Sequence, residues 1–115
     1  MIKKNSSIEF VKFYKNYILT LSNIADKINL EKLYEAASLI LKTIKKNKFI
    51  YVCGNGGSAA IANHYVCDYF KGLSKYTNLK AKIKSLNSDS YLISAISNDI
   101  AYDQVFKLQA ERYMN

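Results

Sequence analysis

The stretch "CGNGGSAAIANHYVCDYFKG", residues 53–72, decides the fold, because three glycines in four positions separate an apolar run from a helical pattern. The apolar run before it, residues 49–52, reads Phe-Ile-Tyr-Val and predicts a short strand over residues 49–53 that is apolar on both faces. Because glycine has no Cβ, Gly54, Gly56 and Gly57 predict a tight turn with φ > 0 that a ligand can approach closely. The sequence therefore predicts a strand, a glycine turn and a helix, in that order.

Ser58 stands at the position that we expect for the N-cap of this helix. The N–H groups of the first helical turn point outward and carry the positive end of the helix dipole. The turn therefore predicts an anion site, and phosphate is the usual occupant of such a site. The alternative is an ordinary strand-to-helix turn whose glycines only relieve steric crowding.

The helix after the turn has two different faces. A wheel of 100° per residue places one group of side chains on a broad apolar face: Ala62, Tyr65, Val66, Tyr69, Phe70 and Leu73. His64 and Asp68 lie four residues apart on roughly the opposite face. They are either a solvated pair that stabilises the helix by a few tenths of a kcal/mol, about 0.3, or a catalytic or metal-binding pair.

Two helices are expected before the strand. Apolar residues at helical spacing predict an amphipathic helix over residues 7–26, opening near Ser6 or Ser7. Asn29 is expected to cap the second helix.

A second strand is expected after a loop at 73–80. In the run "AKIKSLN", residues 81–87, lysines alternate with apolar residues, which is typical of a strand at or near a sheet edge. A short helix started by Ser88 or Asp89 and a last helix over 101–115 follow.

These elements predict an α/β fold with a parallel sheet and several helices. Two strands are fewer than the four to six or so that sheets usually have, so the chain reads as the front part of such a fold. We expect one incomplete domain over residues 1–115, with a leading helical pair at 1–47 and the start of the α/β core at 48–115.

The charge and the apolar content of the chain limit the classes of partner that we expect. The net charge of +8 suits nucleic-acid binding, but the lysines are scattered along the sequence without interleaved stacking aromatics, so we expect no nucleic-acid partner. No apolar stretch approaches the ~20 residues of a membrane span, and the N-terminus lacks the apolar core of a signal peptide. We expect a cytoplasmic protein without a membrane anchor.

Cys53 and Cys67 have no Cys-x-x-Cys spacing and are expected to be buried or neutral thiols.

The turn also fits a dinucleotide fingerprint, with Gly54, Gly56 and Ala59 as G-x-G-x-x-A. That interpretation requires an acidic residue at the end of the second strand to hold a ribose hydroxyl. Lysines occupy that strand, so no nucleotide cofactor is expected.

Three features together resemble the sugar isomerase (SIS) domain family, in its phosphoheptose isomerase group. They are "CGNGGSAAIANH", the acidic residue four positions after the histidine, and "SDSYLISAISNDIAYDQVF". The resemblance implies a doubly wound α/β fold, with a parallel sheet flanked by helices, that assembles as a homotetramer with active sites between subunits. It also implies isomerisation of sedoheptulose 7-phosphate to glycero-manno-heptose 7-phosphate, which supplies heptose for lipopolysaccharide or capsule.

The resemblance also implies roles for residues of this chain. Ser58 is expected to bind phosphate together with the turn residues Gly56 and Gly57, Asn55 to contact the substrate, and Asp89 to contact sugar hydroxyls.

His64 matches a zinc ligand of the family, and Asp68 stands where the family has a glutamate that acts as metal ligand and general base. The aspartate is one methylene shorter than that glutamate. The family's second phosphate-binding loop and its distal glutamine and histidine have no counterpart, since His64 is the only histidine of this chain. We therefore expect the 115-residue chain alone to be inactive. The alternative is a catalytically inactive SIS module that binds sugar phosphates or another protein, such as the replication initiator.

Overall fold

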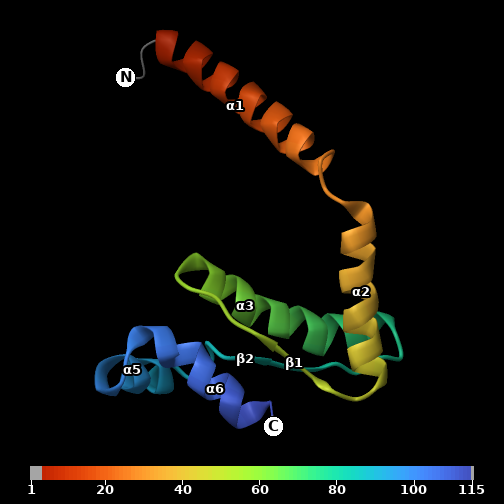
Figure 1. Cartoon of the computed structure of the whole chain (residues 1–115). Helices are drawn as coiled ribbons and strands as arrows, with labels where there is room; N and C mark the ends of the chain where they lie inside the picture. Colours follow the sequence, from red (N-terminus) through yellow and green to blue (C-terminus); the bar gives the residue numbers. More distant parts are fainter. Residues whose placement is uncertain (1–3, 115) are drawn as a thin grey trace. The chain divides into compact units, whose positions relative to one another are not determined.

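The computed structural model describes residues 4–114, in two compact units, Met1–Ala37 and Ser38–Asn115. The first unit contains helix α1 (Lys4–Ala25) and the beginning of helix α2 (Leu30–Lys45). The second unit contains the rest of α2 and every strand among the described residues (Figure 1). This second unit carries the candidate site.

Helix α1 begins by Lys4, earlier than the start predicted near Ser6 or Ser7, and it ends at Ala25. Both serines lie within the helix, where serine costs only a fraction of a kcal/mol, about 0.5, relative to alanine. The predicted cap of α2 is confirmed. Lys32 N donates to Asn29 Oδ1 at 3.0 Å, and Leu33 N donates to the Asn29 carbonyl at 3.0 Å.

Asn47 ends α2 and turns the chain into the first strand. Its φ is +56°, in the left-handed region that asparagine tolerates better than most residues. Asn47 N donates to the Ile44 carbonyl at 2.9 Å, and Lys48 N donates to the Thr43 carbonyl at 3.1 Å. This pair of bonds is a Schellman motif, which satisfies the last carbonyls of the helix and fixes where the strand begins.

Strand β1 (Phe49–Val52) pairs in parallel with strand β2 (Lys82–Ser85), so the predicted parallel pairing is confirmed. The register joins Phe49 to Lys82 and Val52 to Ser85. Alternate side chains face opposite sides of the sheet. Ile50 and Val52 face helix α3 (Gly57–Cys67), and Figure 1 shows α3 running along the sheet.

The opposite face of the sheet meets helix α6 (Val105–Tyr113). The rings of Tyr51 and Tyr113 stack with their centroids 6.2 Å apart, and Tyr51 Oη donates to the Tyr113 carbonyl at 2.8 Å. Contacts to α3 on one side and α6 on the other give the layered arrangement expected of an α/β fold.

The helical pattern after the glycine turn runs further than predicted. A π-helical segment η1 (Asp68–Leu73) and a short helix α4 (Ser74–Tyr76) continue α3, so the loop predicted at 73–80 begins only at Thr77. The apolar face is confirmed for Ala62, which is buried, and for half-buried Tyr65, Val66, Tyr69 and Leu73.

Phe70 was predicted on that apolar face, and the prediction is wrong because its side chain is 73% exposed. A π turn holds more residues than an α turn, so a wheel of 100° per residue misplaces side chains within η1.

The chain ends in two helices. Helix α5 (Ser90–Asp99) has Asp89 at its N-cap position, one of the two starts that were predicted. The predicted last helix is divided into a 3₁₀ turn, η2 (Tyr102–Gln104), and α6. The buried apolar residues of the described chain are Ile44, Ala62, Leu86, Ile96 and Val105.

The structure also bears on the two cysteines and on the question of a membrane-spanning helix. Cys53 and Cys67 are both exposed, so the first of the two alternatives, buried thiols, is wrong, and the second, neutral thiols, stays a prediction. Both lie where local pattern does not determine exposure, one directly after β1 and one at the end of α3. Across residues 4–114, no helix is long and apolar enough to span a membrane.

Tyr65 and Tyr69 form a hydrogen-bonded pair on the apolar face. Tyr65 Oη donates to Tyr69 Oη at 2.9 Å, and the ring centroids lie 4.4 Å apart. Burial, and then this hydrogen bond, raises the pKa of Tyr65 from 10.0 to about 12. The folded state therefore holds the Tyr65 proton over a pH range in which the unfolded chain loses it.

We predict that the free energy of unfolding falls as the pH rises from about 10 to about 12, because the unfolded state binds fewer protons there. The Tyr65→Phe chain should show a shallower fall, and urea unfolding at a series of pH values measures it. Tyr76→Phe is the matched control, since Tyr76 is exposed. Identical pH slopes for the wild-type chain and Tyr65→Phe would contradict the assignment.

Candidate functional site

The glycine turn lies at the carboxyl end of β1 and opens directly into α3. Gly56 occupies the N-cap position with φ +54° and is the one glycine with positive φ among residues 4–114. Gly57 is the first residue of the helix and has open space around it. The expectation that positive φ marks the turn is therefore confirmed at Gly56 and not at Gly54 or Gly57.

Gly54 is required for a different reason. A Cβ at this position would lie 2.5 Å from both the carbonyl carbon and the carbonyl oxygen of Ser58. The backbone of the turn therefore touches the backbone of the first helical turn, and only glycine leaves room for this contact.

Ser58 is not the N-cap, and that prediction is wrong. Gly56 takes the cap position through its backbone conformation, and no side chain caps α3. Ser58 N donates to the Asn55 carbonyl at 2.9 Å, and Ala59 N donates to the Gly56 carbonyl at 3.1 Å. The hydroxyl of Ser58 is thus not used to cap the helix, and the residue is exposed.

Asn87 ties the turn to the second strand. Gly54 N donates to Asn87 Oδ1 at 2.8 Å, and Asn87 Nδ2 donates to the Gly54 carbonyl at 2.8 Å. Leu86 N donates to the Val52 carbonyl at 2.9 Å, at the end of the paired strands. The two bonds between Asn87 and Gly54 lie beyond it and continue the ladder of the sheet. The asparagine side chain acts as one more rung of the sheet.

Tyr102 brings a third segment to the turn. Its Oη donates to Asn55 Oδ1 at 3.0 Å across 47 residues of sequence. Neither Asn87 nor Tyr102 was among the site residues predicted from the sequence. Asn87 could have been found, because the carboxyl ends of neighbouring parallel strands meet at one edge. The place of Tyr102 depends on the path between α5 and α6, for which the sequence offers no signal.

Asp89 lies at the same edge of the sheet because it follows β2. Its carboxylate lies 4.0 Å from Lys84 Nζ and accepts a 3.4 Å hydrogen bond from Ser88 Oγ. Its backbone carbonyl accepts hydrogen bonds from Leu92 N and Ile93 N in the first turn of α5. Within residues 4–114, no hydrogen bond or ion pair joins Asp89 to the glycine turn.

His64 and Asp68 lie on the exposed side of the helix, away from the apolar face, as predicted. The distance from His64 Nε2 to Asp68 Oδ2 is 3.5 Å, and the two side chains are 75% and 63% exposed. Asp68 is the first residue of η1, so the pair spans the junction between α-helical and π-helical turns. In the described part of the chain, neither residue contacts Asn55 or Ser58 through a hydrogen bond or ion pair.

His64 and Asp68 alone do not provide enough ligands for a metal site. Structural and catalytic zinc sites use three or four protein ligands, whereas this pair supplies two. No group of three His, Cys, Asp or Glu side chains that could hold a metal ion occurs in the chain as far as it is described. The described residues by themselves therefore do not fit a zinc ion.

Residues 12–114 match the SIS domain. The chain belongs to the SIS-domain family. Among the relatives of this SIS chain, the phosphoheptose isomerase of Helicobacter pylori strain 26695 is 36% identical over 81 residues, which are 70% of this chain and 42% of that protein. The phosphoheptose isomerase of Aliarcobacter butzleri is 37% identical over 81 residues, with the same coverage of 70% and 42%.

A solved structure agrees with these relatives. Phosphoheptose isomerase GmhA from Neisseria gonorrhoeae superposes with a TM-score of 0.73 at 31% identity, over 91% of this chain and 54% of that chain. The predicted SIS-type fold is therefore confirmed for the part that is compared. The SIS chain spans about half the length of the relatives that it matches.

Gly54→Ala and Gly57→Ala should have opposite effects on stability. We predict that Gly54→Ala destabilises the chain by about 1–3 kcal/mol, because the new Cβ collides with the Ser58 backbone. Gly57→Ala should stabilise it by about 0.5 kcal/mol, because alanine fits the open helical position better than glycine. Urea unfolding measures both changes, and equal effects of the two variants would refute the steric role of Gly54.

Proposed function

We propose that this chain forms part of a sugar-phosphate aldose–ketose isomerase that converts sedoheptulose 7-phosphate to glycero-manno-heptose 7-phosphate. Such an enzyme supplies heptose for lipopolysaccharide or capsule. One observation carries the proposal: the glycine turn, held by Asn87 at the carboxyl edge of a parallel sheet, presents Asn55 and Ser58. Relatives that are named phosphoheptose isomerase support it.

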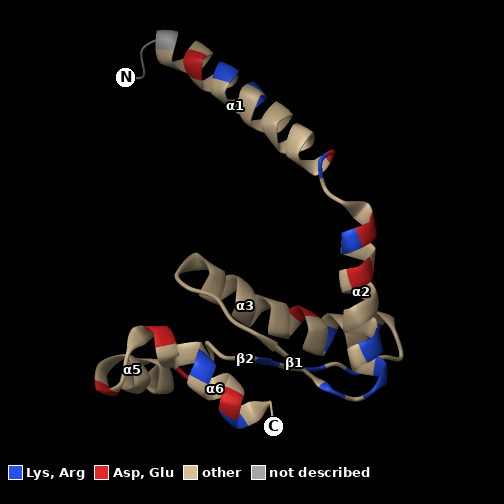
Figure 2. Cartoon of the chain, in the orientation of Figure 1, with Lys and Arg blue, Asp and Glu red and all other residues tan. Residues whose placement is uncertain are grey.

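The phosphate group would sit at the glycine turn. The N-terminus of α3 provides the positive end of a helix dipole, Ser58 provides a hydroxyl, and Gly56 and Gly57 leave the backbone accessible. Figure 2 shows lysines along β2 and in the segment that joins α2 to β1, and the net charge is +8. Positive charge of this kind raises the local concentration of an anionic substrate. Asn55 would orient the sugar from the same turn, and Asp89 would bind its hydroxyls.

The proton transfer would fall to Asp68. Isomerisation moves a proton between C1 and C2 through an enediol, and a carboxylate on one face of the substrate can take and return that proton. His64, one helical turn away, would stabilise the oxygen that becomes negative. Zinc stays a proposal: the pair would supply two ligands, and the remaining donors would come from outside this chain.

Assembly would complete the site. We propose a cytoplasmic homotetramer with sites shared between subunits. Exposed aromatic residues on α1 support association: Phe13 is 66% exposed and Tyr17 54% exposed, and their rings stack 6.3 Å apart. The chain by itself is expected to have little isomerase activity, because one base without its partner groups transfers protons poorly. An inactive binding module is not favoured, since the relatives carry the name of an enzyme.

Ser58→Ala tests the phosphate assignment. We predict that the wild-type chain binds sedoheptulose 7-phosphate and that Ser58→Ala binds it about tenfold more weakly, because a hydrogen bond to a charged group is lost. Isothermal titration calorimetry measures both affinities. Thermal stability should stay the same, because Ser58 does not cap α3.

Ser94→Ala is the matched control, because it removes the hydroxyl of an exposed serine on α5. It should bind like the wild-type chain. Equal affinities of the wild-type chain and Ser58→Ala would rule out the hydroxyl as a phosphate ligand, and absence of binding to the wild-type chain would contradict the site as a whole.

A further inference from the structure

Tyr102 joins the segment between α5 and α6 to the glycine turn through one side-chain hydrogen bond. Its Oη donates to Asn55 Oδ1 at 3.0 Å. Tyr102 is the first residue of η2, and Gln104 N donates to the Ala101 carbonyl at 3.1 Å across this 3₁₀ turn. The tyrosine is 62% exposed, so burial in the core does not account for its place beside the glycine turn.

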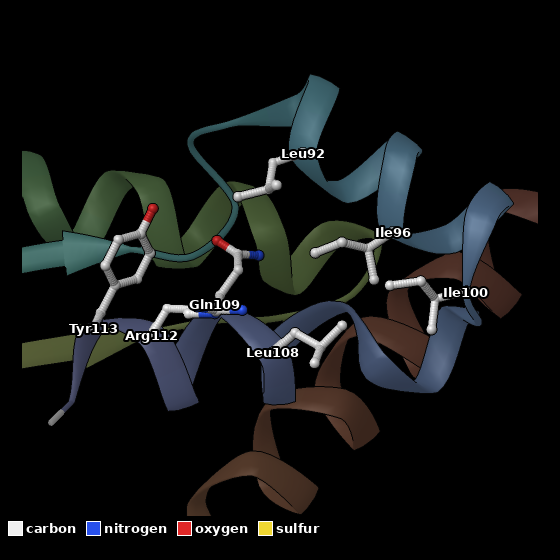
Figure 3. A pocket seen from close by; sticks show the side chains of 7 residues that line it. All are labelled: Leu92, Ile96, Ile100, Leu108, Gln109, Arg112 and Tyr113. Atoms are coloured by element: carbon white, nitrogen blue, oxygen red, sulfur yellow. The ribbon is translucent and has the colours of Figure 1, made fainter.

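The helices on either side of η2 hold Tyr102 in place. Ile100 N and Ala101 N both donate to the Ile96 carbonyl at 3.0 Å, which ends α5 directly before η2. Ile96 and Ile100 also line the pocket between α5 and α6 (Figure 3). On the other side of η2, Val105 begins α6 and is 2% exposed. The short turn is therefore anchored at both ends, and it presents Tyr102 from a fixed position.

The hydrogen bond determines what Asn55 offers to a ligand. An asparagine amide has an oxygen that accepts hydrogen bonds and an NH₂ group that donates two. The Tyr102 hydroxyl occupies Oδ1, and no hydrogen bond within residues 4–114 uses Asn55 Nδ2. Asn55 is exposed, so the two donors of its amide can meet a ligand at the turn.

Side-chain donors matter at this turn because part of its backbone is already used. Ser58 N and Ala59 N donate to the Asn55 and Gly56 carbonyls, so these N–H groups at the start of α3 have partners within the turn. The phosphate and carbonyl oxygens of a sugar phosphate accept hydrogen bonds and do not donate them. An amide that presents Nδ2 therefore attracts these oxygens, whereas an amide that presents Oδ1 repels them.

We propose that Tyr102 is a positioning residue for Asn55. By donating to Oδ1, the tyrosine hydroxyl turns the amide so that Nδ2 donates to an acceptor oxygen of the bound sugar phosphate. This inference rests on the proposed sugar-phosphate site, and it adds a residue from a distant segment of the chain to that site. Tyr102 itself touches the amide and not the substrate.

The chain without ligand tests the positioning itself. In the ¹⁵N,¹³C-labelled chain, three-bond couplings that report χ1 of Asn55 should indicate one rotamer, and Tyr102→Phe should average them over several rotamers. Tyr91→Phe is the matched control, because it removes the hydroxyl of an exposed tyrosine on α5, and it should keep the wild-type couplings. Wild-type couplings in Tyr102→Phe would overturn the proposal.

Calorimetric titration with sedoheptulose 7-phosphate tests whether Tyr102 acts through Asn55. Tyr102→Phe and Asn55→Ala should each weaken binding about fivefold, as expected for the loss of one hydrogen bond. The double variant should bind no more weakly than Asn55→Ala alone, because both changes act through one amide. A purely structural role of Tyr102 would instead weaken binding equally in the presence and in the absence of the Asn55 side chain.

Two outcomes separate this inference from the proposed function. If the wild-type chain binds the sugar phosphate and Tyr102→Phe binds it equally well, the role of Tyr102 is wrong and the site stands. The same conclusion follows if the effects of Tyr102→Phe and Asn55→Ala multiply in the double variant. If the wild-type chain does not bind, the proposed site and the role assigned to Asn55 Nδ2 are overturned together.

Discussion

The two hydrogen bonds between the Asn87 side chain and the Gly54 backbone are the interaction on which the candidate site depends. Each is 2.8 Å long, and together they join the segments that leave β1 and β2. A sheet of two short strands holds its carboxyl edge weakly by itself. The asparagine extends the ladder past Val52 and holds the turn that presents Asn55 and Ser58.

Two of the three glycines of the turn meet different requirements, and the third meets none. Gly54 makes room for the backbone of Ser58, Gly56 takes a positive φ and starts the helix, and Gly57 meets neither steric nor conformational limits in this chain. The N-terminus of α3 and the exposed residue Ser58 then follow Asn55 directly in the same turn. Local backbone geometry therefore determines which groups are free to meet an anion.

The local parts of the fold could be predicted from the sequence. The cap at Asn29, the start of α5 at one of its two predicted residues, Asp89, and the two strands follow from neighbouring residues and were found. The errors arise where a local rule meets a competing constraint: Gly56 displaces Ser58 as the cap, and the π turn exposes Phe70. Asn87 acts across 33 residues and could have been placed from the parallel pairing of the two strands, whereas Tyr102 acts across 47 residues, a range that lies outside periodicity and propensity.

Amide hydrogen exchange at Gly54 tests the central role of Asn87 most directly. The Gly54 amide should be protected in the wild-type chain and should exchange at least about tenfold faster in Asn87→Ala, because its acceptor is removed. The Leu86 amide, which donates to the Val52 carbonyl, should keep its protection and serves as the internal reference. A Gly54 amide that exchanges at the same rate in both chains would contradict the account.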